Sequence, residues 1–156
     1  MKHTYTYLED YVLKFYSKID IFHPYQLEPE IITTRLGMSL VYIPYNSMNA
    51  GNTIFLDDRL TVPQQWQDFG HELCHALWHT GNQLNLPLPY KEYQEWKADN
   101  FAHHVCIPTF MLDRMNLNRN EHKNVWKIQE MFQVEREFAE KRLQQYVCNT
   151  LQNLYR

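Results

Sequence analysis

Two histidines four residues apart, with a glutamate beside the first, are the residues best suited to metal chemistry. The motif H-E-L-C-H spans residues 71–75 and lies in a segment, Gln64 to His79, whose pattern predicts a helix. Because residues four apart share one helix face, His71 and His75 could bind one metal ion through neutral ring nitrogens at roughly 2.0–2.1 Å. Glu72 is not needed as a ligand and could take a proton from a water activated by the metal. Two ligands do not complete a site, so a third is expected elsewhere.

Two candidates for the third ligand lie on the same helix. His79 is eight residues from His71, and the helical rise separates them by about 12 Å along the axis, too far to share one ion. We therefore expect His79 to be partly buried or to hydrogen-bond to a ligand. Cys74 offers a thiolate, but its side chain would point well away from the two imidazoles. We expect Cys74 to be a small buried thiol.

The third candidate, Glu95, lies on a separate helix that the pattern predicts from Tyr90 to Cys106. A carboxylate from a helix packed across the first would complete a set of two histidines and one glutamate, which keeps one coordination position open. Asp99, four residues later on the same face, could accept a hydrogen bond from the non-ligating nitrogen of a metal-binding histidine and so fix the ring. Glu92 is a rival without such a partner, and Glu95 could also be an ordinary surface carboxylate.

The composition is that of an ordinary globular protein. The 156 residues have the length of one domain, residues 1–156, and 44% of them are hydrophobic, enough for a core. The net charge of −3 gives no sign of the basic surface that binds nucleic acid directly. The polar start is unlike a signal peptide, and no run is long enough to span a membrane. Three widely spaced cysteines suit reduced thiols, so we expect a cytoplasmic protein.

Hydrophobic spacing predicts helices on both sides of a short β-rich stretch. Two or three short antiparallel strands are expected, among them Met38–Ile43 and Asn52–Leu56, with a turn at Asn49-Ala50-Gly51. Besides the two helices above, we expect helices over Tyr5–Lys18, Gln26–Leu36, Thr109–Met115, Val125–Phe132 and Glu135 to about Leu151. Helices therefore dominate, and a small sheet precedes the metal-binding helix. That plan is α+β.

Several local signals sharpen these boundaries. Gly37 is placed to end the helix before it. Thr61, followed by Pro63 and by Gln64 three residues on, reads as the start of the metal-binding helix. In the helix from residue 90 to 106 we expect Trp96, Phe101 and Val105 to be buried, and residues 81–89 and 116–120 to be loops.

The two candidate helices together resemble the ImmA/IrrE family of metallopeptidases. That family has an H-E-L-G-H helix, a variable loop, and a helix that reads approximately E-x-E-A-N-x-F-A with a proline soon after. Here residues 71–75 read H-E-L-C-H, residues 95–102 read E-W-K-A-D-N-F-A, and Pro108 follows. Residues 132–134 and 141–143 are similar to the family's closing segment. The resemblance covers about residues 52 to 145.

Four residues depart from the family pattern. Cys74 replaces the usual glycine, and Lys97 stands where the family often has glutamate. His103 and His104 replace smaller or acidic residues. His103 extends the face of Glu95 and Asp99 by one turn and could help to polarise a substrate carbonyl, although we expect an exposed side chain. None of these departures removes a presumed ligand or the base.

The resemblance implies a cytoplasmic endopeptidase that uses zinc or another divalent metal. Several members act in mobile genetic elements or stress responses by cleaving a helix-turn-helix transcriptional repressor. Residues carried over from the family are His71, His75 and Glu95 as metal ligands and Glu72 as the general base. The expected partner is therefore a protein substrate.

Two other functions would also fit parts of the chain. The metal could stabilise a non-catalytic module that sequesters a partner protein, although Glu72 then has no role that glutamine would not serve. Residues 128–134 with the following helix faintly resemble a helix-turn-helix, but the acidic residues there would repel phosphates. Finally, an exposed edge of the strand at residues 53–56 could hold an extended peptide by strand addition, or this strand could be an ordinary core strand.

Overall fold

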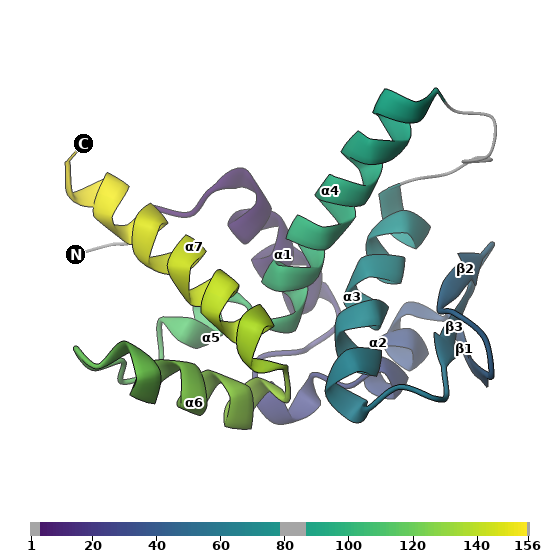
Figure 1. Ribbon diagram of the computed structural model, residues 1–156, viewed down its shortest axis with the longest axis horizontal. Coiled ribbons are helices and arrows are strands. Elements are labelled where there is room, and N and C mark those ends of the chain that lie inside the picture. The colour runs from purple at the N-terminus through teal and green to yellow at the C-terminus, as the bar shows by residue number, and fades with distance from the viewer. Residues whose placement is uncertain (1–3, 79–86, 156) are drawn as a thin grey trace. The chain divides into compact units, whose positions relative to one another are not determined.

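The computed structural model describes residues 4–78 and 87–155 (Figure 1). These residues form two compact units. One lies within residues 28–103 and carries the strands, and we call it the sheet unit. The other joins the N-terminal stretch up to Leu27 with the chain from His104 onward, and we call it the helical unit. Mostly helical content with one small sheet confirms the α+β class expected from the sequence.

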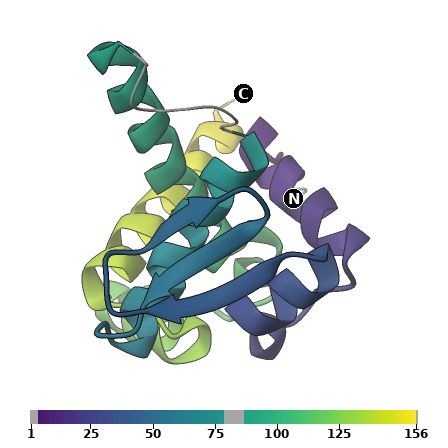
Figure 2. The same ribbon diagram turned by 90° about the vertical axis from the view of Figure 1, so that its right-hand side faces the viewer.

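The sheet has three strands, β1 (Ser39–Ile43), β2 (Met48–Ala50) and β3 (Thr53–Asp57), in the order β1-β3-β2 (Figure 2). β2 and β3 are antiparallel and are joined by a two-residue turn. Gly51 opens this turn with a φ of 55°, a left-handed conformation that suits glycine. β1 runs parallel to β3, so the antiparallel pairing expected for the sheet is wrong for this pair. After β1 the chain crosses to the far edge of the sheet and runs back as β2, opposite in direction to β1. The turn after β2 then leads into β3, which has the direction of β1.

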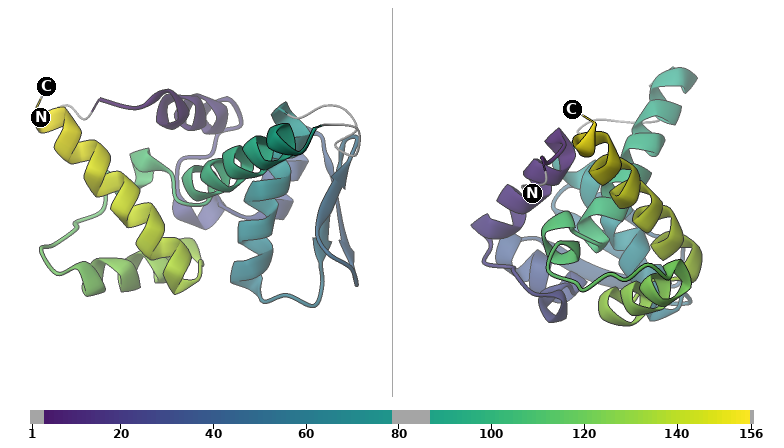
Figure 3. Two further views of the ribbon diagram at one scale, coloured as in Figure 1. Left: turned by 45° about the horizontal axis from the view of Figure 1, so that its top comes forward. Right: turned by 90° about the vertical axis from the view of Figure 1, so that its left-hand side faces the viewer.

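One face of the sheet packs against α3 (Val62–Trp78), as Figure 3 shows in its left panel. Ile54 and Leu56 alternate along β3 and are fully buried, while Phe69 and Leu73 are fully buried on α3. Burying each of these side chains contributes about 1.5–3 kcal/mol relative to leaving it exposed. This packing fixes α3 on the sheet. Before the sheet, α2 (Pro29–Leu36) ends as predicted at a glycine, whose φ is 70°.

α4 runs from Leu88 to Cys106. It begins two residues before the expected start because Pro89 is tolerated in a first helical turn. Phe101 and Val105 are fully buried as predicted, but Trp96 is 63% exposed, so the prediction that Trp96 is buried is wrong. Trp96 lies two residues before the buried Ala98, about 200° around the helix, and so faces the opposite side.

The helical unit contains the remaining elements. They are α1 (Tyr7–Lys18), the 3₁₀ helix η1 (Pro24–Gln26), the end of α4, α5 (Thr109–Leu112), α6 (Glu121–Phe132) and α7 (Arg136–Leu154). α6 begins four residues before the predicted start, because the side chain of Asn120 accepts a hydrogen bond from the backbone of Lys123 at 3.2 Å and caps the helix. No helix in the described ranges is long and apolar enough to cross a bilayer.

A buried polar network connects α7 with α1 inside the helical unit. The Arg142 side chain is fully buried, and its guanidinium donates to the carbonyl of Ile107 at 3.0 Å and to the hydroxyl of Thr109 at 2.7 Å. That hydroxyl donates to the carboxylate of Glu9 at 2.9 Å. Glu9 also accepts from the backbone N–H of Thr6 at 2.8 Å, closing the cap of α1. The network therefore places a buried cation and a buried carboxylate on either side of one hydroxyl.

Candidate metal centre

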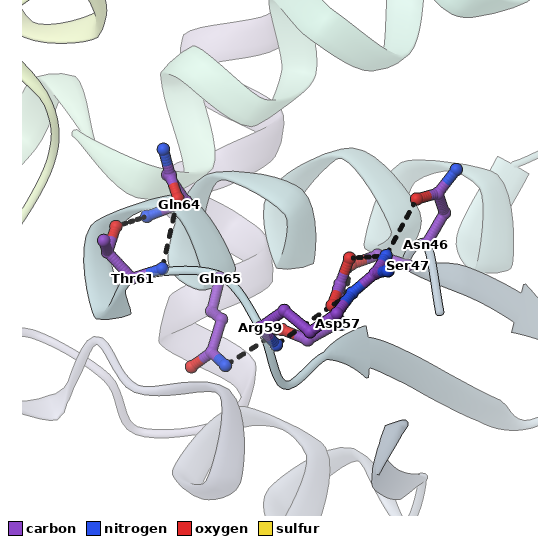
Figure 4. Close-up of polar contacts among 7 residues, drawn as sticks. All are labelled: Asn46, Ser47, Asp57, Arg59, Thr61, Gln64 and Gln65. Carbon is purple, nitrogen blue, oxygen red and sulfur yellow. Dashed lines mark hydrogen bonds and ion pairs between the residues drawn. The ribbon is translucent and has the colours of Figure 1, made fainter. Parts of the chain in front are cut away.

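Side-chain hydrogen bonds fix the connection between β3 and α3 (Figure 4). Asp57, the last residue of β3, accepts hydrogen bonds from the Arg59 guanidinium at 2.8 and 2.9 Å, and these bonds lower the pKa of Asp57. The backbone N–H of Asp57 donates to Ser47 at 3.0 Å, and Gln65 in the first turn of α3 donates to the Asp57 carbonyl at 3.0 Å. The helix therefore starts from a fixed point at the end of the sheet.

The start of α3 is capped as the sequence predicts. Gln64 donates its backbone N–H to the Thr61 hydroxyl at 3.3 Å, and the Gln64 side chain accepts from the Thr61 backbone at 3.1 Å. Each side chain thus accepts a hydrogen bond from a backbone N–H group at the start of the helix. Together with the bonds of Asp57, this cap fixes the rotation of α3 about its own axis. It thereby sets the direction in which His71 and His75 point.

His71 and His75 lie on one face of α3, and their Nε2 atoms are 3.1 Å apart. The side chain of His71 is 22% exposed and that of His75 only 5% exposed. Burial, and then the neighbouring His71, lower the pKa of His75. His75 is therefore held in the neutral form, which is the form that binds metal.

Glu95 of α4 brings its carboxylate to both imidazoles. Its oxygens lie 2.9 Å from Nε2 of His71 and 3.2 Å from Nε2 of His75. In a tetrahedral site with bonds of roughly 2.0–2.1 Å, the ligand atoms stand about 3.3–3.4 Å apart. The ligand atoms of the three side chains thus lie nearly as far apart as the ligand atoms of such a site. They could hold one metal ion.

Aromatic contacts hold α3 and α4 together beside this cluster. The Trp78 ring meets the Phe101 ring edge-on at a centroid distance of 5.0 Å, and Nζ of Lys97 lies 4.7 Å from the centre of the Trp78 ring. An ammonium over an indole face is attracted by the ring's charge distribution. Lys97 was noted from the sequence only as a departure from the family pattern. Its role here depends on a contact between distant residues, which no local signal reveals.

Asp99 lies one turn beyond Glu95 and reaches the other nitrogen of His71. Its Oδ1 atom is 2.8 Å from His71 Nδ1. In that contact Nδ1–H donates to the carboxylate, so the lone pair of Nε2 points toward Glu95 and His75. A carboxylate behind a histidine in this way orients the ring and makes it a stronger ligand.

The sequence of the chain matches a known family across these elements. Residues 26–144 match the sequence model of the Peptidase_M78 family, described as the IrrE N-terminal-like domain. The chain belongs to this family. It is 35% identical to the Uncharacterized protein YqaB of Bacillus subtilis (strain 168), over 99% of this chain and 92% of YqaB. It is also 34% identical to the Phage-like element PBSX protein XkdA of the same organism, over 90% of this chain and 73% of XkdA.

Membership in the Peptidase_M78 family suggests a metallopeptidase-type domain. Within this domain, Glu72 has the environment of a proton acceptor. It follows His71 directly on α3 and is half-buried. Burial raises the pKa of Glu72 to about 7, against the opposing effect of His71. A carboxyl group with a pKa near neutral can accept and release a proton under ordinary conditions.

Other candidate residues of the Peptidase_M78 chain do not join the cluster in the described structure. Cys74 is fully buried, and burial raises the pKa of its thiol to about 12, so it is a protonated thiol. Glu92 is exposed and lies outside the three converging side chains. His103 is only 7% exposed and bonds through Nδ1 to the Asp99 carbonyl at 2.7 Å, so the expectation that it is exposed is wrong. His79 lies outside the described residues.

Replacing Asp99 with alanine should weaken metal binding without removing it. The change deletes the acceptor of His71 Nδ1–H but leaves all three converging side chains in place. We expect the metal affinity to fall by roughly 10–100-fold, the usual effect of losing such a partner. Competition with a calibrated zinc chelator would measure it. An affinity within twofold of the unchanged protein would contradict a role for Asp99 in orienting His71.

Proposed function

We propose that this protein is a zinc-dependent endopeptidase that cleaves a protein substrate, and that the substrate is a helix-turn-helix transcriptional repressor. His71, His75 and Glu95 bind the metal, Glu72 is the general base, and Asp99 orients His71. The observation that carries the proposal is the convergence of two imidazoles and one carboxylate at 2.9–3.2 Å beside a half-buried glutamate. Family membership supports the peptidase class.

The chemistry follows from the positions of these side chains. A divalent ion bound there would polarise the scissile carbonyl and lower the pKa of a water molecule to about 7. Glu72 would accept a proton from the attacking water as the bond between the water oxygen and the carbonyl carbon forms. Glu72 then passes the proton to the leaving nitrogen as the C–N bond breaks, which completes hydrolysis. Asp99 keeps His71 in the tautomer whose Nε2 lone pair faces the metal position.

The substrate is proposed to lie along the edge of the sheet. Of the two alternatives for the strand at residues 53–56, an exposed edge or a core strand, the structure has the core strand, because β3 pairs with β1 on one side and with β2 on the other. The outer edge of β2 remains, and β2 packs against the metal-binding helix α3. An extended peptide could pair with this edge through main-chain hydrogen bonds. We propose that the scissile segment binds there.

The proposal also covers the domain organisation and the cellular compartment of the protein. We propose one metallopeptidase domain over residues 1–156, because the family match at residues 26–144 includes the sheet unit and much of the helical unit. We also propose that the protein acts in the cytoplasm. In the described residues Cys74, Cys106 and Cys148 form no disulfide, which suits a reducing compartment. The name of the relative XkdA places that protein in a phage-like element, the setting in which repressor cleavage would have a purpose.

The function can be tested on a repressor encoded beside the gene of this protein. The purified protein, loaded with one equivalent of zinc, is incubated with that repressor, and the products are identified by intact mass spectrometry. We expect two complementary fragments, and no fragments after the metal is removed with a chelator. Cleavage that continues at the same rate in the metal-free protein would overturn the proposal, as would an intact repressor at full zinc occupancy.

Substituting Glu95 tests the ligand set without any substrate. Glu95→Ala should reduce zinc content to well below one ion per chain, because two histidines alone do not complete a site. Glu92→Ala is the matched control: it removes an exposed glutamate one turn earlier on the same helix and should leave zinc content unchanged. Elemental analysis after gel filtration gives both values. Equal metal content in the two variants would mean that Glu95 is not a ligand.

A further inference from the structure

The helical unit contains a groove whose residues have no part in the proposed chemistry. Residues of η1, α5 and α6 line it, together with residues 114–116, and its volume is about 690 Å³. Its apolar lining is formed by Met111, Met115, Trp126 and Met131. An engineered cavity of ~150 Å³ holds one benzene ring, so the groove has room for several apolar side chains.

The lining combines a buried floor with an exposed wall. Met111 is 2% exposed at the floor, whereas Trp126 is 63% and Met131 is 44% exposed on α6. Methionine side chains are flexible and polarisable, and they adapt to partners of different shapes. Large apolar side chains that gather at one groove and stay this exposed indicate a binding surface.

The charges at the groove favour an anionic partner. Arg114 and Lys127 border it together with the single carboxylate of Glu130. In the described structure both cations contact neutral groups: Arg114 donates to the carbonyls of Phe110 and Phe22, and Lys127 donates to the carbonyl of Asn116 at 3.1 Å. The groove is thus locally positive on a chain whose net charge is −3, and it would attract acidic groups.

We infer that this groove docks an amphipathic helix of a partner protein, with the apolar face of the helix against the methionines and Trp126. Acidic side chains at the border of that helix lie beside Arg114 and Lys127. A helix with apolar anchors one turn apart fits an open apolar groove of this kind. A small-molecule ligand is disfavoured, because such ligands are typically 70–90% buried and the α6 wall is open to solvent. The inference does not depend on proteolysis.

The NMR signals of the methionine methyl groups show whether the groove is occupied. The full-length protein is labelled with ¹³C at its methionine methyl groups and titrated with an 18-residue helical peptide that has leucines on one face and glutamates along both borders. We expect the signals of Met111, Met115 and Met131 to shift while those of Met38 and Met48, in the sheet unit, stay in place. The same peptide with lysines in place of the glutamates should bind about tenfold more weakly or worse. With serines in place of the leucines, binding should vanish.

A pair of equally exposed positions supplies the control. Met131→Asp should abolish binding of the acidic peptide, whereas Val147→Asp on α7, also 44% exposed but outside the groove, should bind as the unchanged protein does. Circular dichroism checks that both variants remain folded. The inference is overturned if the peptide shifts no groove methionine at millimolar concentration. It is also overturned if the lysine peptide binds as tightly, or if a folded Met131→Asp variant retains full affinity.

Discussion

Replacing Glu72 with glutamine should lower the rate of substrate cleavage by about 10²–10⁴-fold, the usual contribution of a positioned base. Glutamine has nearly the same shape as glutamate, but its amide cannot accept the proton of the attacking water. Glu72 is not among the three converging side chains. Zinc content should therefore remain at one ion per chain. The cleavage rate under single-turnover conditions, measured beside zinc content, tests both parts.

The Glu72 experiment separates catalysis from a structural role. If Glu72 only stabilises the fold, the glutamine variant should have an altered free energy of unfolding and an unchanged cleavage rate. A variant that cleaves at the original rate with full zinc would remove Glu72 as the base. Glu92→Gln on the surface of α4 is the control, because it makes the same chemical change away from the cluster and should leave the rate unchanged.

Replacing Arg142 with methionine should lower the free energy of unfolding by about 3–5 kcal/mol. Methionine keeps much of the side-chain volume but removes the guanidinium, so Glu9, itself only 2% exposed, loses its counter-charge, and the Ile107 carbonyl and the Thr109 hydroxyl lose their donor. Such a loss is a large part of the 5–15 kcal/mol that stabilises a typical domain. Urea unfolding followed by circular dichroism at neutral pH would measure it.

An exposed arginine on the same helix is the control for Arg142. Arg136 pairs with Glu140 at 2.8 Å, and its side chain is 64% exposed. Arg136→Met should therefore change stability by only about 0.3–0.5 kcal/mol. Adding Glu9→Gln to Arg142→Met should recover part of the lost stability, because it removes the uncompensated buried charge. If Arg142→Met is as stable as Arg136→Met, the buried network is not a source of stability.

Local signals in the sequence predicted the start of α3 and the end of α2. Thr61 and Gln64 cap the helix through bonds between residues three apart, and Gly37 takes the left-handed conformation that ends α2. The spacing of His71 and His75 likewise needed only helical geometry. These features depend on residues that are close to one another in the sequence. They can therefore be predicted from the sequence alone.

Features that depend on distant neighbours were not predicted correctly. The strand pattern around residues 38–56 does not show that β1 lies parallel to β3, because alternation of side chains is the same in both directions. The sequence predicts a buried Trp96 and an exposed His103, yet the packing of α4 exposes Trp96 and buries His103. Residues 116–120 form the predicted loop, but the bond by which Asn120 caps α6, a contact between near neighbours in the chain, was not predicted.

The candidate metal cluster could be predicted only in part. The sequence and the family resemblance together proposed Glu95 and Asp99, because both lie on one face of a helix. Their distances to His71, however, depend on how α3 and α4 cross within the sheet unit. That crossing is held in part by Trp78 between Lys97 and Phe101, contacts that no spacing rule contains.

The connection between β3 and α3 is short, and hydrogen bonds hold both of its ends. A residue added at positions 58–61 would lengthen the path between these ends and would strain or break the bond from Gln65 to the Asp57 carbonyl. If α3 shifted on the sheet in response, His71 and His75 would move relative to Glu95. Insertions in this connection should therefore be disfavoured wherever the cluster is used.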